Sequence, residues 1–93
     1  MPFCTLLEWD GPFDLDKYEE MNRSSGVHEV LPDGLLARIV GAVDSGARIV
    51  EVWRAPEDAS DFNAKHGHLV AEFEIPPPSR VAAFDATVFQ TAD

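Results

Sequence analysis

A histidine in the second half of the chain has the side chain best suited to chemistry near neutral pH. At about 100° per residue, His66 falls on the apolar side of a predicted helix, and His68 falls on its polar side. An imidazole on an apolar face can accept a substrate proton or coordinate a metal or haem iron. It can equally be a core histidine with a satisfied hydrogen bond. The apolar side comprises Ala59, Phe62, Asn63, His66, Leu69, Val70 and Phe73.

Two polar residues lie one helical turn apart in the first half of the chain. Tyr18 and Asn22 share the inner side of a predicted helix over residues 15–25. A phenol hydroxyl and an amide in that arrangement can both hydrogen-bond a bound carbonyl or phenolate. Together with His66, they are the predicted catalytic residues. The alternative for Tyr18 is a packing residue with its hydroxyl at the rim of the core.

Other residues fit the binding of an aromatic ligand. Trp53, near the end of a predicted strand, can stack on a ring, although a core or interface position is also open. Arg38 can stabilise an enolate or peroxide anion in a dry pocket, or it can form an ion pair. The predicted substrate-binding residues are Trp53, Phe62, Leu69 and Arg38.

Several kinds of site are not expected. The i, i+2 spacing of His66 and His68 sends the two imidazoles to different sides of a helix, so they do not form a chelating pair. Cys4 is the only cysteine, which excludes an intrachain disulfide or a thiolate metal cluster. Phosphate-binding glycine loops and dinucleotide fingerprints are missing from the sequence, so we expect no cofactor and no metal.

Charge and composition narrow the partners. Seventeen acidic against seven basic residues give a net charge of −10, which disfavours nucleic acid and anionic membranes as partners. The 45% of hydrophobic residues predicts a folded protein, and 93 residues predict one domain over 1–93. Because the start of the sequence has no basic leader and Cys4 is unpaired, we expect a cytoplasmic protein.

The elements that must position these residues follow from periodicity and turn signals. Gly and Pro turns separate them, and residues 27–32 are predicted to form a loop that could cover a pocket. Gly46 is expected to adopt the positive φ angle of a hairpin. We predict strands at 3–9, 35–43, 47–54 and 80–90, and helices at 15–25 and from Pro56 to no further than Ile75.

This order, strand-helix-strand-strand-helix-strand, predicts an α+β, ferredoxin-like fold with a four-stranded antiparallel sheet and both helices on one face. The two central predicted strands carry apolar residues at both parities, for example Leu36 and Val40 against Leu35 and Ile39. Both faces of the sheet should therefore be buried. The simplest cover for the face without helices is the sheet of a second subunit.

The pattern resembles the dimeric α+β barrel superfamily, particularly small proteins of the antibiotic biosynthesis monooxygenase type. The resemblance rests on Val52-Trp53, on RAPEDASDF at 54–62, on His66 and on DLDKYEEMN at 14–22. It implies a homodimer with a pocket in each subunit. Members of the superfamily include cofactor-independent oxygenases of polycyclic phenols, haem-degrading enzymes, muconolactone isomerases and polyketide cyclases.

The resemblance also implies roles for individual residues. Family oxygenases line their pocket with asparagine, tryptophan and histidine, which Asn22, Trp53 and His66 could supply. Haem-degrading members instead carry their asparagine on the first strand, where this chain has Thr5 and Leu7, so haem degradation is not favoured.

The function predicted from the sequence is proton abstraction by His66 from an aromatic or polyketide-like small molecule, without a cofactor. The outcome would be that of a monooxygenase or of an isomerase or cyclase. The alternative is a non-catalytic, small-molecule-binding or stress-associated dimer in which His66 is structural.

Overall fold

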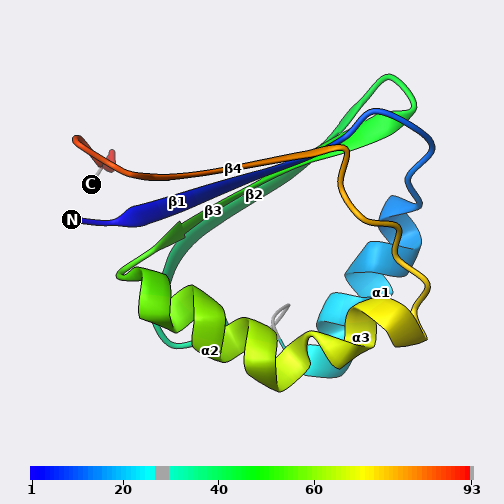
Figure 1. Cartoon of the computed structure of the whole chain (residues 1–93), viewed down its shortest axis with the longest axis horizontal. Helices are drawn as coiled ribbons and strands as arrows, with labels where there is room; N and C mark the ends of the chain where they lie inside the picture. Colours follow the sequence, from blue (N-terminus) through cyan, green and yellow to red (C-terminus); the bar gives the residue numbers. More distant parts are fainter. Residues whose placement is uncertain (27–29, 93) are drawn as a thin grey trace.

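A computed structural model describes residues 1–26 and 30–92. The described chain forms one antiparallel sheet with strand order β2-β3-β1-β4 and three helices. This confirms the predicted ferredoxin-like α+β fold (Figure 1). The elements are β1 Phe3–Trp9, α1 Leu15–Ser25, β2 Leu35–Val43, β3 Gly46–Trp53, α2 Pro56–His66, α3 His68–Glu72 and β4 Arg80–Asp85.

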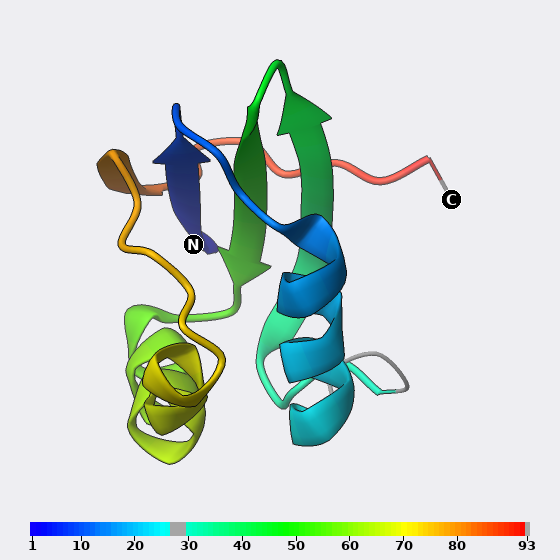
Figure 2. The same ribbon diagram turned by 90° about the vertical axis from the view of Figure 1, so that its right-hand side faces the viewer.

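All three helices lie on the same side of the sheet, as Figures 1 and 2 show from two directions. The main core fills the space between them and the sheet, where apolar side chains are removed from water. No helix of the described residues covers the opposite face. The core residues are Trp9, Tyr18, Met21, Ala47, Ile49 and Ile75.

Helix α1 begins and ends where the sequence predicts. The Asp14 side chain accepts a hydrogen bond from the Lys17 backbone N–H at 3.0 Å, which caps the first turn. Gly26, at φ 83°, ends the helix in the left-handed conformation that glycine adopts without steric cost. Between these caps, Tyr18 and Asn22 are buried on the side facing the sheet.

Strand register places three polar residues side by side on the helix-facing side of the sheet. Glu51 pairs with Thr5 across β1 and with Arg38 across β2. Its strand neighbours of the same parity, Ile49 and Trp53, are almost fully buried. Since residues two apart on a strand share a face, Glu51 is also directed toward the core.

The β2–β3 hairpin differs from the prediction in detail. β3 begins at Gly46 and ends at Trp53, one residue before the expected 47–54 at each end. The positive φ angle belongs to Asp44, at 51°, and not to Gly46. Gly46 is instead required by close packing, since a Cβ there would lie 1.8 Å from the carbonyl oxygen of Trp9.

The predicted second helix is divided at Gly67. The Gly67 N–H donates to the Asn63 carbonyl at 2.8 Å, and a Cβ at this position would lie only 2.5 Å from the same oxygen. Glycine has a low helix propensity and allows this tight turn. The chain then continues as the short helix α3, which ends before Pro76 as expected.

β4 ends at Asp85 and not at Gln90 as predicted. Asp85 is paired with Phe3, the first residue of β1, so the ladder has no further partner. The Ala86 N–H donates to the Pro2 carbonyl at 2.8 Å, and Ala86 is buried in a small cluster with Cys4 and Val52. The apolar–polar alternation within residues 80–90 could not show where β4 loses its partner, because that depends on where β1 begins.

The predicted loop at 27–32 is described only in part. Residues 27–29, which include His28, lie outside the described residues, whereas Val30, Leu31 and Pro32 belong to no helix or strand. Gly34, at φ 88°, forms the predicted turn before β2. Within the described residues, none of the helices has the length and apolar composition that crossing a membrane would require.

Candidate functional site

An inner cavity of about 120 Å³ lies between the helix-facing side of the sheet and the three helices. It brings together every predicted site residue except Trp53: His66, Tyr18, Asn22, Phe62, Leu69 and Arg38. Glu51, Ser25 and Asn63 add further polar groups to its wall. Most of the remaining wall is aliphatic, which is the composition typical of a small-molecule site.

Helix α1 supplies a hydroxyl and an amide to this cavity. Tyr18 is 8% exposed and Asn22 is 5% exposed. Burial raises the pKa of Tyr18, although nearby Arg38 and Asn22 act to lower it, so the phenol stays protonated and can donate. Asn22 Nδ2 meets no acceptor at hydrogen-bonding geometry among the described residues. A buried amide donor without a partner is costly unless a ligand or water satisfies it.

The sheet supplies a carboxyl group that the predicted site lacks. Burial raises the pKa of Glu51, against the opposing effects of Thr5, Arg38 and Trp53. Thr5 Oγ1 donates to Glu51 Oε1 at 3.2 Å. The sequence signal for Glu51 is its position midway between Ile49 and Trp53 on the core-facing parity of a strand. That signal is weak while strand facing is uncertain by one residue.

Arg38 lies between α1 and the sheet. Its guanidinium carbon is 5.5 Å from the centre of the Tyr18 ring, and Nη2 lies 3.3 Å from Glu19 Oε1. The sequence left open whether Arg38 forms an ion pair or lines a pocket, and in the structure it does both. A guanidinium held in this way adds positive charge to one wall of the cavity.

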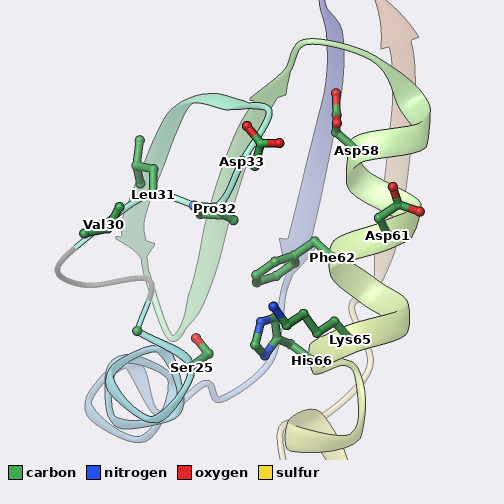
Figure 3. Close-up of a pocket in the computed structure, with 11 residues that line it drawn as sticks. Ser25, Val30, Leu31, Pro32, Asp33, Asp58, Asp61, Phe62, Lys65 and His66 are labelled. Atoms are coloured by element: carbon green, nitrogen blue, oxygen red, sulfur yellow. The ribbon is translucent and has the colours of Figure 1, made fainter.

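His66 stands in the last turn of α2, half-buried and beside Phe62. The two ring centres are 4.8 Å apart, with the planes tilted by 46°. Figure 3 shows both side chains directed from α2 toward the end of α1 and the segment of Val30 to Pro32. Gly67 follows directly, so the helix division and the histidine lie at the same place on the cavity wall.

An outer groove of about 410 Å³ adjoins the same two aromatic residues (Figure 3). Ser25, Phe62 and His66 line both spaces, so the groove adjoins the inner cavity at these residues. The groove carries the carboxylates of Asp33, Asp58 and Asp61, together with Lys65. Arg54 lies 3.0 Å from Asp58 and 3.8 Å from Asp33, which offsets part of this negative charge.

Trp53 is placed behind Phe62 and not in the cavity wall. It is 1% exposed and packs with Leu35 and Ala59, and its ring centre lies 5.7 Å from that of Phe62. Its Nε1 has no partner at hydrogen-bonding geometry among the described residues, although it lies near enough to Glu51 to lower the carboxyl pKa. Trp53 thus supports Phe62 and Glu51 from the core.

Metal ligation has little support in this region. Among residues 1–26 and 30–92, no three His, Cys, Asp or Glu side chains gather as a potential metal site. His68 is exposed, and Cys4 is buried as a free thiol. The cavity instead offers hydrogen-bond donors, a carboxyl group and an imidazole, which are groups that can take part in proton transfer.

Comparison with known proteins gives the fold independent support. No protein-family model and no curated protein matches the sequence. Among solved structures, a presumed antibiotic biosynthesis monooxygenase from Chloroflexus aurantiacus J-10-fl matches with a TM-score of 0.71 and 11% identity over 100% of both chains. The structural-genomics protein YJCS matches with a TM-score of 0.69 and 9% identity, over 94% of this chain and 100% of that one.

A third similar structure is Rv0793 from Mycobacterium tuberculosis, with a TM-score of 0.60 and 12% identity over 100% of both chains. These identities establish likeness of fold and leave the reaction open. A structure from Deinococcus radiodurans matches with a TM-score of 0.60 and 10% identity over 100% of this chain and 99% of that one. The resemblance noted in the sequence is confirmed at the level of fold: the chain has the fold of two structures, from Chloroflexus aurantiacus and Deinococcus radiodurans, that are named as antibiotic biosynthesis monooxygenases.

Proposed function

We propose that the inner cavity binds one ring of an aromatic or polyketide-like small molecule and that His66 removes a proton from it. The observation that carries this proposal is the gathering of His66, Tyr18 and Asn22 around one cavity. A base and two hydrogen-bond donors around an apolar space form a minimal site for making an enolate or phenolate.

The cavity volume bears on the size of the substrate. An engineered apolar cavity of about 150 Å³ binds benzene, and the inner cavity here measures about 120 Å³. The space therefore suits about one ring. A larger substrate would leave its remaining part in the outer groove, beside Phe62 and His66, which line both spaces.

The chemical roles follow from the position of each group. His66 accepts the proton at the mouth of the cavity, from which it can return the proton to water or to the product. Tyr18 and Asn22 donate hydrogen bonds to the oxygen that becomes negative, and the Arg38 charge stabilises it further. Trp53, Phe62 and Leu69 complete the apolar surroundings, with Trp53 acting from behind Phe62.

Two outcomes share this first step. In a cofactor-independent monooxygenase, the carbanion supplies the electrons, and dioxygen supplies one oxygen atom to the product and loses the other as water. In an isomerase or cyclase, the carbanion is reprotonated or attacks within the molecule. The solved structures named as monooxygenases support the first outcome by analogy of fold alone.

Measuring oxygen consumption together with product formation over a panel of phenols and aromatic ketones would test the proposal and separate the outcomes. Wild-type protein should turn over at least one compound, with oxygen uptake for a monooxygenase and without it for an isomerase or cyclase. His66→Ala should lose turnover by about a hundredfold or more, the usual contribution of a general base. The exposed His68→Ala is the matched control and should keep full activity.

The second candidate function is non-catalytic binding, and the small volume of the inner cavity favours it. Like the enzyme, a binding protein would be stabilised against unfolding by the ring compounds that it binds, but it would convert none of them. His66→Ala would then change ligand affinity and nothing else.

We further propose a cytoplasmic homodimer that binds neither nucleic acid nor membrane. The helix-free face of the sheet supports the dimer, because Ile39 is 64% exposed and Phe84 is 53% exposed there. Both belong to the face that also carries Val52, opposite the helices. Large exposed apolar side chains gathered on one face favour association. The unpaired Cys4 supports the cytoplasmic location, and the net charge of −10 supports the absence of nucleic-acid and membrane binding.

A further inference from the structure

The wall of the inner cavity carries two buried polar side chains, Asn22 and Glu51. Proton transfer by His66 does not require both of them. Asn22, on α1, is 5% exposed, and its Nδ2 has no hydrogen-bond acceptor among the described residues. Glu51, on β3, lines the same cavity and accepts a hydrogen bond from Thr5 on Oε1, with the Trp53 side chain near enough to lower its pKa. One group is an unused donor, and the other has an unused acceptor oxygen.

The position of Glu51 is unusual for a purely structural carboxylate. Arg38, its cross-strand neighbour, is directed to Glu19 at 3.3 Å and forms no ion pair with Glu51 within 4.0 Å. A buried carboxyl group without a close cation is unfavourable, and such groups are concentrated at functional sites. Thr5, Arg38 and Trp53 offset part of this cost, and the pKa of Glu51 is still raised by burial. Much of the remaining cavity wall is apolar, with Leu7, Met21, Leu35 and Leu69.

We infer that Glu51 and Asn22 determine ligand specificity by binding a donor and an acceptor on the same ring, so that the preferred ligand is a hydroxyaryl ketone. Glu51 accepts a hydrogen bond from the ligand hydroxyl, and Asn22 Nδ2 donates one to the ligand carbonyl. A site built to bond such groups rejects analogues that lack them, because its own buried polar atoms are then left unpaired. This inference rests on the proposed function in using the same cavity and the same Asn22 donor, and it requires no proton transfer by His66.

The test measures binding, with turnover left aside. The probes are 2-, 3- and 4-hydroxyacetophenone, with acetophenone lacking the hydroxyl and phenol lacking the carbonyl. Dissociation constants come from calorimetry or thermal shift on the whole protein. For wild type, the tightest hydroxyacetophenone isomer should bind about tenfold or more tightly than acetophenone and than phenol, the usual value of a hydrogen bond to a buried polar group.

Two substitutions should remove one preference each. Glu51→Leu should reduce the hydroxyl preference to about onefold and leave the carbonyl preference. Asn22→Leu should do the reverse. Glu57→Leu, on the exposed first turn of α2, is the matched control and should leave both unchanged. If Glu51→Leu fails to fold, Glu51→Gln replaces it. The hydroxyl preference, which is the ratio of the dissociation constants of acetophenone and hydroxyacetophenone, should then fall by at least threefold.

The inference is overturned if none of the three isomers binds more tightly than both single-group compounds, or if the preferences survive in the Glu51 and Asn22 variants. His66→Ala should retain both preferences. Unchanged turnover in His66→Ala together with intact preferences would contradict the proposed function alone. Lost turnover without any Glu51 effect on binding would contradict this inference alone.

Discussion

Burial gives the ionisable side chains of the inner cavity distinct roles. The Tyr18 hydroxyl and the Glu51 carboxyl both have raised pKa values, with burial as the leading cause. Each therefore holds its proton to higher pH than in water, which suits Tyr18 as a donor. His66 stands at the mouth of the cavity, half in contact with solvent, where a proton can enter and leave.

Glu51 should leave a signature in the pH dependence of stability. Burial raises the pKa of Glu51 in the folded state above its ordinary value of 4.5, so the native protein binds more protons than the unfolded chain in the pH range between the two pKa values. Stability must therefore fall as pH rises from about 4.5 through the folded pKa. Glu51→Gln removes this loss, so the variant should gain stability relative to wild type as pH rises.

Urea unfolding of both proteins at several values from pH 4 to pH 8 measures this difference. Glu57→Gln, at an exposed position, serves as the control and should follow the wild-type curve. Parallel curves for wild type and Glu51→Gln would show that the carboxyl group titrates as it does in the unfolded chain, contrary to its buried position.

Among the elements, the division between α2 and α3 is the feature that shapes the cavity most directly. Gly67 lines the inner cavity, and His66 and Leu69 on either side of it do so as well. In a continuous helix, Gly67 would lie about 100° from His66 and about 160° from Leu69 around the axis, so the three residues would not share one face. The division gives α3 its own direction, as Figure 1 shows, and Leu69 and Val70 of α3 line the cavity.

Substituting Gly67 tests that description. In an ordinary helix, replacing glycine by alanine stabilises by up to about 1 kcal/mol. Here the new Cβ would lie 2.5 Å from the Asn63 carbonyl oxygen, so Gly67→Ala should instead destabilise the protein and weaken ligand binding in the cavity. Thermal unfolding with and without a ring compound measures both effects. A gain in stability would mean that the helix passes smoothly through residue 67.

The sequence predicted most elements because their signals are local. Asp14 and Gly26 mark the two ends of α1, and both act as the sequence indicates. The early end of β4 and the close packing of Gly46 against Trp9 depend on distant parts of the chain, so no local pattern contains them. For the same reason, Glu51 and its cavity position could be read only after the register was known.

At the scale of the whole molecule, the two faces of the sheet differ sharply. One is covered by helices and contains the cavity. The other exposes Ile39 and Phe84, and near the end of β1 it carries an ion-pair network of Arg48 and Arg80 with Glu8 and Asp10. An apolar surface bordered by ion pairs is typical of a protein interface.

Ile39→Asp should therefore shift the proposed dimer to a monomer, because it places an unpaired charge in the apolar contact. Analytical ultracentrifugation over a concentration series measures the change. Val30→Asp is the control, since Val30 is 75% exposed and borders the outer groove on the helix side. A wild-type protein that sediments as a monomer at high concentration would contradict the dimer.

The central claim is that His66 removes a proton from a ring compound held in the inner cavity, whichever product follows. Deuterium exchange reports this step before the outcomes diverge. The probe is 2-indanone, whose acidic carbon–hydrogen bonds exchange in D2O at a rate that proton NMR follows directly. Without oxygen, wild-type protein should accelerate this exchange well above the buffer rate, and His66→Ala should return it to that rate. Exchange at the buffer rate with wild type, or equal acceleration by His66→Ala, would contradict the claim.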